Sequence, residues 1–371
     1  MSSPQSTRKY LPRFIVIGLI LVLAVYGSLA AARSAATPNR DYAQKQLLAS
    51  AGWLQEHLQD PNLVVVDVRS DKYFDNRLVP GAIRLPWSDF QFTDSARGIG
   101  GSFVGIHQAQ RMLGDAGLTR GDRIILYDSV ERDGGATASY FFWVLDLLGH
   151  PDKKILERGI DGWVAAGGEI ADTPRLLEAQ LYQAPSGELL LERLALGDFI
   201  ENRLGDRHYQ ILDVRSREEY LGQKPNLGLD GEVLKLGHIP TAYNIDYRLN
   251  WADGETKALK SNAALLELYR GLDPSKAVIT YCHSARRGSF GYFVLRLMGF
   301  SDVRLYDGSW FEWGRPQGFY PVETRENRPR QATLPQVAAQ GGTSGSPTAA
   351  QSATSPASNP SPEGGYVSCG G

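Results

Sequence analysis

The residues best suited to chemistry are a cysteine and the short cationic segment that follows it. Cys282 ends a short apolar, β-prone run, and an apolar-periodic run over residues 289–298 comes after the segment. Because the apolar period changes from strand-like to helix-like, we expect a strand, a tight loop and a helix. The amino end of that helix, together with Arg286 and Arg287, would favour a thiolate over a thiol. The sequence therefore predicts a nucleophilic cysteine in an anion-binding loop.

Composition argues against several other kinds of function. The chain has 371 residues and a formal net charge of -2, so nucleic-acid binding has no electrostatic support. Its six histidines are scattered without ligand spacing, and we expect no metal and no other cofactor. The two cysteines, Cys282 and Cys369, are too few for a disulfide framework, although a bridge between them could form. We expect a monomer.

The two ends of the chain differ from its middle. Residues 14–32 are an uncharged apolar run that follows three basic residues. Its length lies between a signal-peptide core and a short spanning helix, so we expect residues 1–40 to be a signal peptide or an uncleaved membrane anchor. The rest of the chain would then be extracytoplasmic, either periplasmic or secreted. Residues 329–371 are rich in Pro, Ser, Thr and Gly, and we expect them to be disordered.

Between these ends, the same pattern occurs twice. Several segments of the first copy recur in the second copy in the same order and at nearly constant spacing. The clearest pairs are residues 64–70 with 210–216, 124–128 with 278–282, and 159–163 with 306–310. In this comparison, the position of Cys282 is held by Asp128 in the first copy.

Each copy alternates short apolar strands with amphipathic helical stretches. This alternation predicts an α/β domain with a mainly parallel central sheet and helices on both faces. In such sheets ligands gather at the carboxyl ends of the strands, where Cys282 is expected. We assign residues 41–173 to the first domain, 174–187 to a linker and 188–328 to the second domain.

In this arrangement the sequence resembles the tandem-domain rhodanese family, the thiosulfate sulfurtransferases, over nearly all of the globular chain. The resemblance rests on residues 213–216 (DVRS), 237–240 (GHIP), the cysteine loop and 306–313 (YDGSWFEW). The family's active loop is Cys-x-Ser-Gly-x-Arg, and residues 282–287 fit it except that Ala285 replaces the glycine. If that position has a positive φ, the alanine costs about 1 kcal/mol.

The resemblance implies a sulfur transfer in two steps. The Cys282 thiolate would attack the outer sulfur of an anionic donor such as thiosulfate and keep it as a persulfide, and cyanide or a thiol would then remove it. Loop amides, Arg286 and Arg287 would stabilise the anions. We expect His283 to tune access and charge, and Ser284 to donate a hydrogen bond to the sulfur.

Two further positions have interpretations of their own. Arg215 could hold the donor's oxygens, because a guanidinium binds such oxygens as a fork, or it could form a structural pair with Asp213. The sequence leaves both alternatives open. Asp128 cannot carry a sulfane sulfur, so the resemblance implies that the first copy is inactive and supports the active copy across an interdomain cleft.

Three other functions compete with this prediction. Dual-specificity phosphatases of related fold need five residues between cysteine and arginine, whereas four separate Cys282 from Arg287, so a phosphatase is disfavoured. A 3-mercaptopyruvate sulfurtransferase would carry an arginine where Glu219 lies, which weakens that alternative. A non-catalytic sulfur-binding or redox-sensing module remains open.

Overall fold

The computed structural model describes residues 41–132 and 134–327. The predictions for the apolar run at residues 14–32, for the tail at residues 329–371 and for Cys369 lie outside the described residues. Within the described part of the chain, no helix is both long and apolar enough to cross a bilayer.

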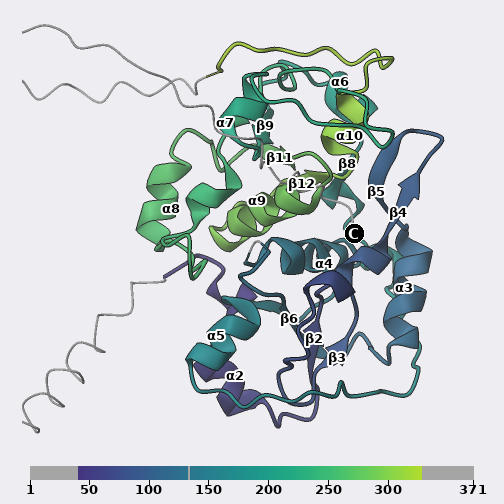
Figure 1. Ribbon diagram of the computed structural model, residues 1–371, viewed down its shortest axis with the longest axis vertical. Coiled ribbons are helices and arrows are strands. Elements are labelled where there is room, and N and C mark those ends of the chain that lie inside the picture. Colours follow the sequence, from purple (N-terminus) through teal and green to yellow (C-terminus); the bar gives the residue numbers. More distant parts are fainter. Residues whose placement is uncertain (1–40, 133, 328–371) are drawn as a thin grey trace, which may run out of the picture. The chain divides into compact units, whose positions relative to one another are not determined.

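Each copy of the repeat forms its own five-stranded sheet (Figure 1). The first sheet has the order β1 (Leu48–Ala49), β7 (Lys153–Leu156), β6 (Arg123–Tyr127), β2 (Leu63–Asp67) and β3 (Ile83–Arg84). The second has the order β10 (Tyr243–Asn244), β9 (Tyr209–Asp213), β11 (Ala277–Tyr281), β12 (Val303–Tyr306) and β8 (Leu194–Ala195). Neighbouring strands of both sheets are parallel, and the strands correspond one to one. The predicted pair of parallel α/β domains is confirmed.

Helices cover both faces of each sheet. In the first repeat they are α2 (Ala51–His57), α3 (Ile106–Asp115), α4 (Ala136–Leu147) and α5 (Gly159–Ala165). In the second they are α6 (Gly197–Glu201), α7 (Arg217–Tyr220), α8 (Asn262–Leu268), α9 (Arg286–Leu297) and α10 (Ser309–Trp313).

The strands at the centre of each sheet show why both faces must be covered. In β6, Ile124 belongs to the core cluster that contains α4, whereas Ile125 belongs to the cluster that contains α2 and α5. In β11, Val278 faces the cluster of α9, and Ile279 faces the cluster of α10. Successive strand residues point to opposite faces, so a continuous apolar run requires helices on both sides.

The two repeats share a core along α4 and α9, which pack against each other. All residues of α4 are buried, and Phe142 of α4 meets Phe293 of α9 edge to face, with 5.1 Å between ring centres. The same core cluster contains residues of both sheets. The helix that follows the cysteine loop is therefore held in place by the first repeat.

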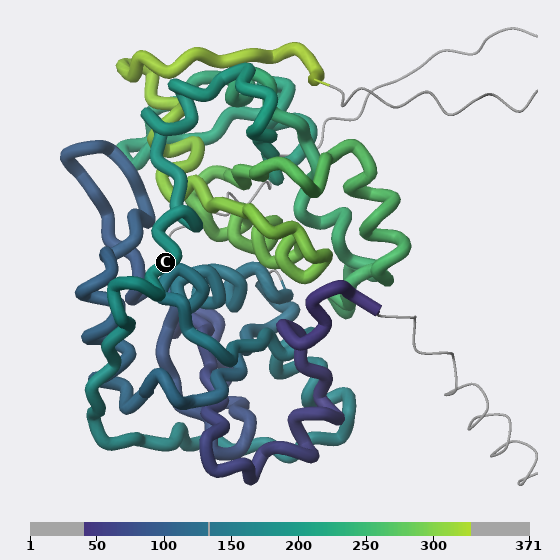
Figure 2. Tube along the Cα trace, turned by 180° about the vertical axis from the view of Figure 1, so that it is seen from behind, coloured from purple at the N-terminus to yellow at the C-terminus, as the bar shows by residue number. Residues whose placement is uncertain are grey.

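Each repeat also extends a segment onto the other. The antiparallel hairpin of β4 (Gln91–Asp94) and β5 (Ile99–Phe103) leaves the first repeat, and Arg97 at its turn pairs with Glu312 of α10. In the second repeat, residues 251–259 form a bridged turn, and Arg158 of the first repeat donates to the Thr256 carbonyl there at 3.3 Å. Figure 2 shows the blue hairpin beside the green and yellow chain of the second repeat.

The segment between the repeats follows the first domain closely. The amide of Arg175 donates to the carbonyl of Ala82, and the amide of Gln180 donates to the carbonyl of Gly114, both at 2.8 Å.

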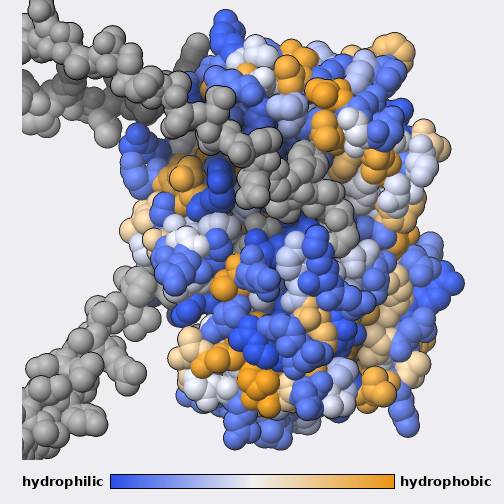
Figure 3. Space-filling view, viewed as in Figure 1, coloured by the Kyte–Doolittle hydropathy of each residue, from blue (hydrophilic) through white to orange (hydrophobic). Residues whose placement is uncertain are grey.

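On the face seen in Figure 3, apolar side chains are scattered among polar ones. That the chain is a monomer stays a prediction.

Candidate active site

The cysteine loop joins the centre of the second sheet to the helix that it shares with the first repeat. β11 ends at Tyr281 and α9 begins at Arg286, so the predicted strand, tight loop and helix are confirmed. The helix begins three residues before the apolar period does, because its first turn contains both arginines and a glycine. A Cβ at Gly288 would lie 3.0 Å from Leu305 and 3.3 Å from the Tyr281 backbone, so this glycine lets the helix start close against the strand.

Ser309 ties the loop to the start of α10. Its hydroxyl oxygen accepts hydrogen bonds from the amides of Cys282 at 3.3 Å and Ala285 at 3.0 Å, and it donates to the Tyr306 carbonyl at 2.8 Å. Ser309 has a φ of 50° and is fully buried. Sequence reasoning missed this residue; its structural equivalent in the first repeat is Gly159, which has a φ of 54° and no side chain to make these contacts.

Ala285 meets the condition under which an alanine should be strained. Its φ is 68° and its ψ is -36°, a combination that residues with a Cβ rarely adopt. The residue is buried, and its carbonyl accepts from the Ser289 amide at 2.7 Å while its own amide bonds to Ser309. The loop is therefore held in its conformation from both sides of the alanine.

The loop and the first turn of α9 contain polar groups without partners in the described part of the chain. The amides of His283, Ser284 and Gly288 donate no hydrogen bond to any described residue. The Ser284 hydroxyl likewise has no partner there and is 4% exposed. Amides at a helix start carry partial positive charge and bind anions, so this loop is suited to an anionic sulfur on Cys282.

The first repeat shows what the same backbone does with an anion. There the carboxylate of Asp128 accepts from the amides of Gly135 at 2.9 Å, Thr137 at 3.1 Å and Ala138 at 3.0 Å. Aligning the first residues of α4 and α9 makes these amides equivalent to those of residues 285, 287 and 288. In one repeat, therefore, an anion on the residue after the central strand is bound by the start of the next helix.

The two loop arginines have different surroundings. Arg287 makes a paired contact with Glu219, with nitrogen–oxygen distances of 2.9 and 3.1 Å. Burial alone would raise the pKa of Glu219, but the Arg287 guanidinium holds that pKa well below its usual range. Glu219 also accepts from the Ser216 amide in the capping box of α7. Much of the charge of Arg287 is thus directed to Glu219, whereas Arg286 is buried directly after the loop.

Arg215 forms the structural pair with Asp213, which was one of the two alternatives for this residue. Its guanidinium forks onto the carboxylate of Asp213, with distances of 3.0 and 2.6 Å, and donates to the Gly237 carbonyl at 2.7 Å. It is fully buried and lies over the ring of Trp310. Arg69 of the first repeat makes the same paired contact with Asp67, although that repeat has no cysteine in its central loop. The geometry favours the structural role, and a role in donor binding stays a prediction.

One of the two ring nitrogens of His283, Nε2, is held by a hydrogen bond and is not free to accept a proton. Its Nε2 lies 3.0 Å from the Leu227 carbonyl, and since a carbonyl can only accept, this nitrogen carries a proton. The ring stacks on Phe311 with 4.2 Å between centres. Phe311 in turn lies against Gly100 of the β4–β5 hairpin, where an added Cβ would come within 3.2 Å of its ring. A segment of the first repeat thus supports the cysteine loop through one aromatic residue.

Asp307 links the loop's surroundings to the first repeat by hydrogen bonds. Its carboxyl accepts from the Phe103 amide at 2.8 Å and from the Tyr140 hydroxyl at 3.2 Å. Burial raises the pKa of Asp307 to about 6. Among the described residues, no group of three or more His, Cys, Asp and Glu side chains is arranged to hold a metal ion.

Comparison with known proteins agrees with this architecture. The model of the rhodanese-like domain matches residues 50–166 and again residues 198–315. A thiosulfate sulfurtransferase of Corynebacterium glutamicum is 31% identical over 77% of this chain and 93% of its own length. The sulfur carrier protein TtuD of Thermus thermophilus is 30% identical over 75% of this chain and 96% of its own.

Solved structures show the same fold. The crystal structure of the Tum1 protein from Saccharomyces cerevisiae superposes with a TM-score of 0.64 at 22% identity, over 75% of this chain and 98% of that one. Because two domain matches and relatives aligned over most of both chains agree, this protein belongs to the rhodanese-like family, as a tandem-domain sulfurtransferase or sulfur carrier.

Proposed function

We propose that the chain is a thiosulfate sulfurtransferase that carries sulfane sulfur on Cys282. The observation that supports this most directly is the pair of equivalent helix starts. In the first repeat the amides there bind the carboxylate of Asp128, and in the second repeat they follow a cysteine. A backbone that binds an anion at this position is suited to bind a thiolate and then a persulfide.

In the first step, the Cys282 thiolate attacks the outer sulfur of thiosulfate. A bond forms between the two sulfurs, the bond to the sulfonate sulfur breaks, and its electron pair leaves with sulfite. In the second step, cyanide or a thiolate attacks the terminal sulfur of the persulfide, and the electron pair of the broken bond returns to Cys282 as a thiolate. No proton has to be removed from the cysteine when it is already ionised.

Several groups can stabilise these anions without moving. The amides of His283, Ser284 and Gly288 and the hydroxyl of Ser284 supply donors, and Arg286 supplies positive charge beside the loop. Preorganised donors of this kind stabilise charge in proportion to how well water is excluded, and this loop is buried. His283 supports the loop by stacking on Phe311 rather than acting as a base through Nε2.

A 3-mercaptopyruvate donor is the weaker candidate. Where that branch carries an arginine, this chain has Glu219, whose buried carboxylate pairs with Arg287 and offers no positive charge to the carboxylate of such a donor. A sulfur carrier with slow turnover is the other candidate, and the Thermus relative is named a sulfur carrier protein.

The decisive experiment is cyanolysis by the purified full chain, with thiosulfate as donor and thiocyanate as the product measured. We expect Cys282→Ser to abolish thiocyanate formation, while the matched control Cys369→Ser retains it. If the unmodified chain forms no more thiocyanate than Cys282→Ser, the enzymatic function is wrong.

Two further measurements separate the candidates. Intact mass after thiosulfate treatment should show one added sulfur that is absent from Cys282→Ser. A carrier would gain this sulfur but turn over slowly. Comparing kcat/KM for thiosulfate and 3-mercaptopyruvate identifies the donor, and a higher value for 3-mercaptopyruvate would contradict the proposal.

A further inference from the structure

The hydroxyl of Ser309 sets the backbone conformation of the cysteine loop. It accepts hydrogen bonds from the amides of Cys282 and Ala285, and it donates to a carbonyl at the end of β12. These two amides enclose those of His283 and Ser284, which donate to no described residue. By fixing the backbone on either side, Ser309 also fixes the direction of the two amides that remain for an anion.

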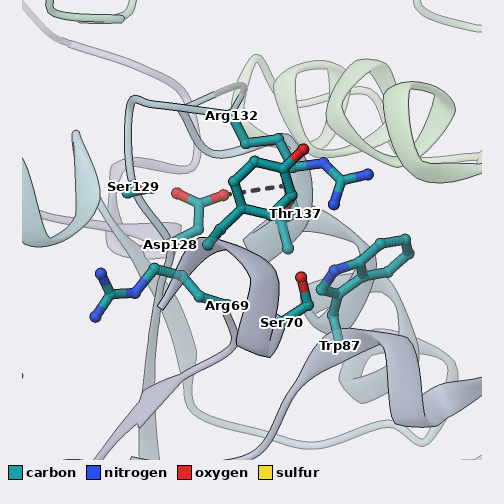
Figure 4. A pocket seen from close by; sticks show the side chains of 8 residues that line it. Arg69, Ser70, Trp87, Asp128, Ser129, Arg132 and Thr137 are labelled. Atoms are coloured by element: carbon teal, nitrogen blue, oxygen red, sulfur yellow. Dashed lines mark hydrogen bonds between the residues drawn. The ribbon is translucent and has the colours of Figure 1, made fainter. Parts of the chain in front are cut away.

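The first repeat has no such hydroxyl. Gly159 lies at the place equivalent to Ser309 and has nearly the same φ, 54° against 50°. A Cβ added to Gly159 would lie 2.1 Å from the carbonyl oxygen of Asp128, so no side chain fits there. That loop is held by its own carboxylate, and Figure 4 shows Asp128 with its hydrogen bond to Thr137. The hydroxyl therefore belongs to the repeat that has the cysteine.

The position of Ser309 depends in turn on Asp307, two residues before it. The Asp307 carboxyl accepts from the Phe103 amide of β5 at 2.8 Å and from the Tyr140 hydroxyl of α4 at 3.2 Å. Both donors belong to the first repeat. Residues 307–309, which lead from β12 into α10, are thus held from outside their own repeat.

The two donors are rigid because one tryptophan packs against both of their rings. The ring of Phe103 meets Trp143 edge to face at 5.3 Å, and the ring of Tyr140 lies 5.4 Å from Trp143. Tyr140 and Trp143 are fully buried in the core of the first repeat. The donors cannot follow a displaced Asp307, so this carboxyl is a fixed point for the start of α10.

We propose that Tyr140 and Asp307 are positioning residues for sulfur transfer, which act on the cysteine loop through Ser309. The inference rests on the proposed function and gives the first repeat a part in the reaction. Neither residue has to touch the donor. A small displacement of the amides that bind the sulfur anion is enough to slow the reaction, because such donors stabilise charge only where they are already aligned.

The test is the rate constant of persulfide formation at saturating thiosulfate, measured per chain that takes up sulfur. Ser309→Gly copies the first repeat and suits a φ of 50°, so it removes the hydroxyl without adding strain. We expect it to lower the rate about tenfold. Tyr140→Phe removes only the bond to Asp307 and should lower it about threefold. The thiosulfate concentration that gives half of the maximal rate should change little.

A matched control and a rescue separate positioning from loss of stability. Tyr127→Phe also removes a buried hydroxyl, one that accepts from the Val79 amide at 3.2 Å within the first repeat. It should cost similar stability but leave the rate unchanged. Asp307→Asn keeps an acceptor oxygen and should retain more of the rate than Asp307→Ala does. Circular dichroism checks that each variant is folded.

Alkylation by iodoacetamide reads the same loop without any sulfur donor. In a Cys369→Ser background, Cys282 is the only thiol of the chain. Ser309→Gly should slow its alkylation, because fewer aligned donors leave less thiolate. A loop that had only loosened would be alkylated faster.

These measurements distinguish the inference from the proposed function. Slower alkylation in a chain that forms no thiocyanate would remove the proposed function and keep the positioning of the thiol. Unchanged persulfide formation in folded Ser309→Gly and Tyr140→Phe would overturn the inference, as would an equal loss of rate in Tyr127→Phe.

Discussion

The two repeats place a carboxylate and a cysteine at the same point of the same fold. In the first, the carboxylate of Asp128 is bound by the amides at the start of α4, and a loop of eight steps leads from it to Ala136. In the second, only four steps separate Cys282 from Arg286. The backbone at the start of this helix can therefore bind an anion whether or not a cysteine is present. What differs is the side chain at this point, a carboxylate in the first repeat and a thiol in the second.

The largest effect should follow from making the second repeat like the first. Cys282→Asp places a carboxylate where the amides can bind it, but a carboxylate cannot hold a transferable sulfur. We expect thiosulfate cyanolysis to fall to the background rate while the protein stays folded, as checked by circular dichroism. Cys282→Ala is the control without an anion and should be equally inactive. Thiocyanate production by either variant would show that another residue carries the sulfur.

Substitutions of Asp128 test how much this carboxylate contributes to the stability of the first repeat. Asp128→Ala leaves three amides, two of them buried, without this acceptor, which should lower the free energy of unfolding by about 3 kcal/mol. Asp128→Asn keeps one acceptor oxygen and should cost less. Urea unfolding of both variants measures the difference. A loss below about 0.5 kcal/mol for the alanine variant would mean that the amides find other partners.

The carboxyl that follows β12 should make the stability of the protein depend on pH. Asp307 is buried and has its pKa raised to about 6, against 3.8 for an ordinary aspartate. The folded state then binds this proton more tightly than the unfolded chain does. The stability that this protonated carboxyl contributes is present below about pH 4 and is lost as the pH rises through about 6, an effect of about 3 kcal/mol.

Urea unfolding between pH 4 and 7 checks this expectation. Asp307→Asn should flatten that part of the profile, because an amide does not titrate. Asp161, in α5 of the first repeat, pairs with Arg77 at 2.9 Å, and Asp161→Asn is the control. An unchanged slope in Asp307→Asn would assign the pH dependence to other groups.

The smallest effect concerns the loop backbone itself. Ala285 has a φ of 68°, which glycine adopts without strain, so Ala285→Gly should raise the free energy of unfolding by up to about 1 kcal/mol. The gain is offset in part by the lost methyl group and the freer unfolded chain. Thermal unfolding measures the sum, and Ala136→Gly, at an ordinary helical position of the first repeat, should destabilise. A loss of stability in Ala285→Gly would show that packing of the methyl group outweighs the strain.

Local patterns were enough to predict the domains and the loop. Strand alternation and the recurrence of residues 64–70 at 210–216 identified two α/β units, and the change of period at Cys282 located the strand, loop and helix. These signals are local because the burial of a strand and the periodicity of a helix depend on the types of residues that are close in the sequence. Even so, the start of α9 was set three residues too late, since its first turn is not apolar.

Contacts between distant residues could not be predicted in the same way. The Ser309 hydroxyl meets the Ala285 amide 24 residues away, and Asp307 meets Phe103 at a separation of 204. Neither contact leaves a periodic signal. For Arg215, the sequence allowed two partners, and only the folded strand end shows that Asp213 is within reach. Membrane anchoring through residues 14–32 stays a prediction.

The core shared by α4 and α9 bears on why the first repeat persists without a cysteine at its central loop. Every residue of α4 is buried, and much of what covers it belongs to the second repeat. A chain cut between the repeats would expose that helix as a continuous apolar stripe on one fragment and its counterpart on the other. Such fragments should precipitate when produced singly and recover solubility when coexpressed. Selection for a soluble product is thus sufficient to retain a repeat that has Asp128 in the place of the cysteine.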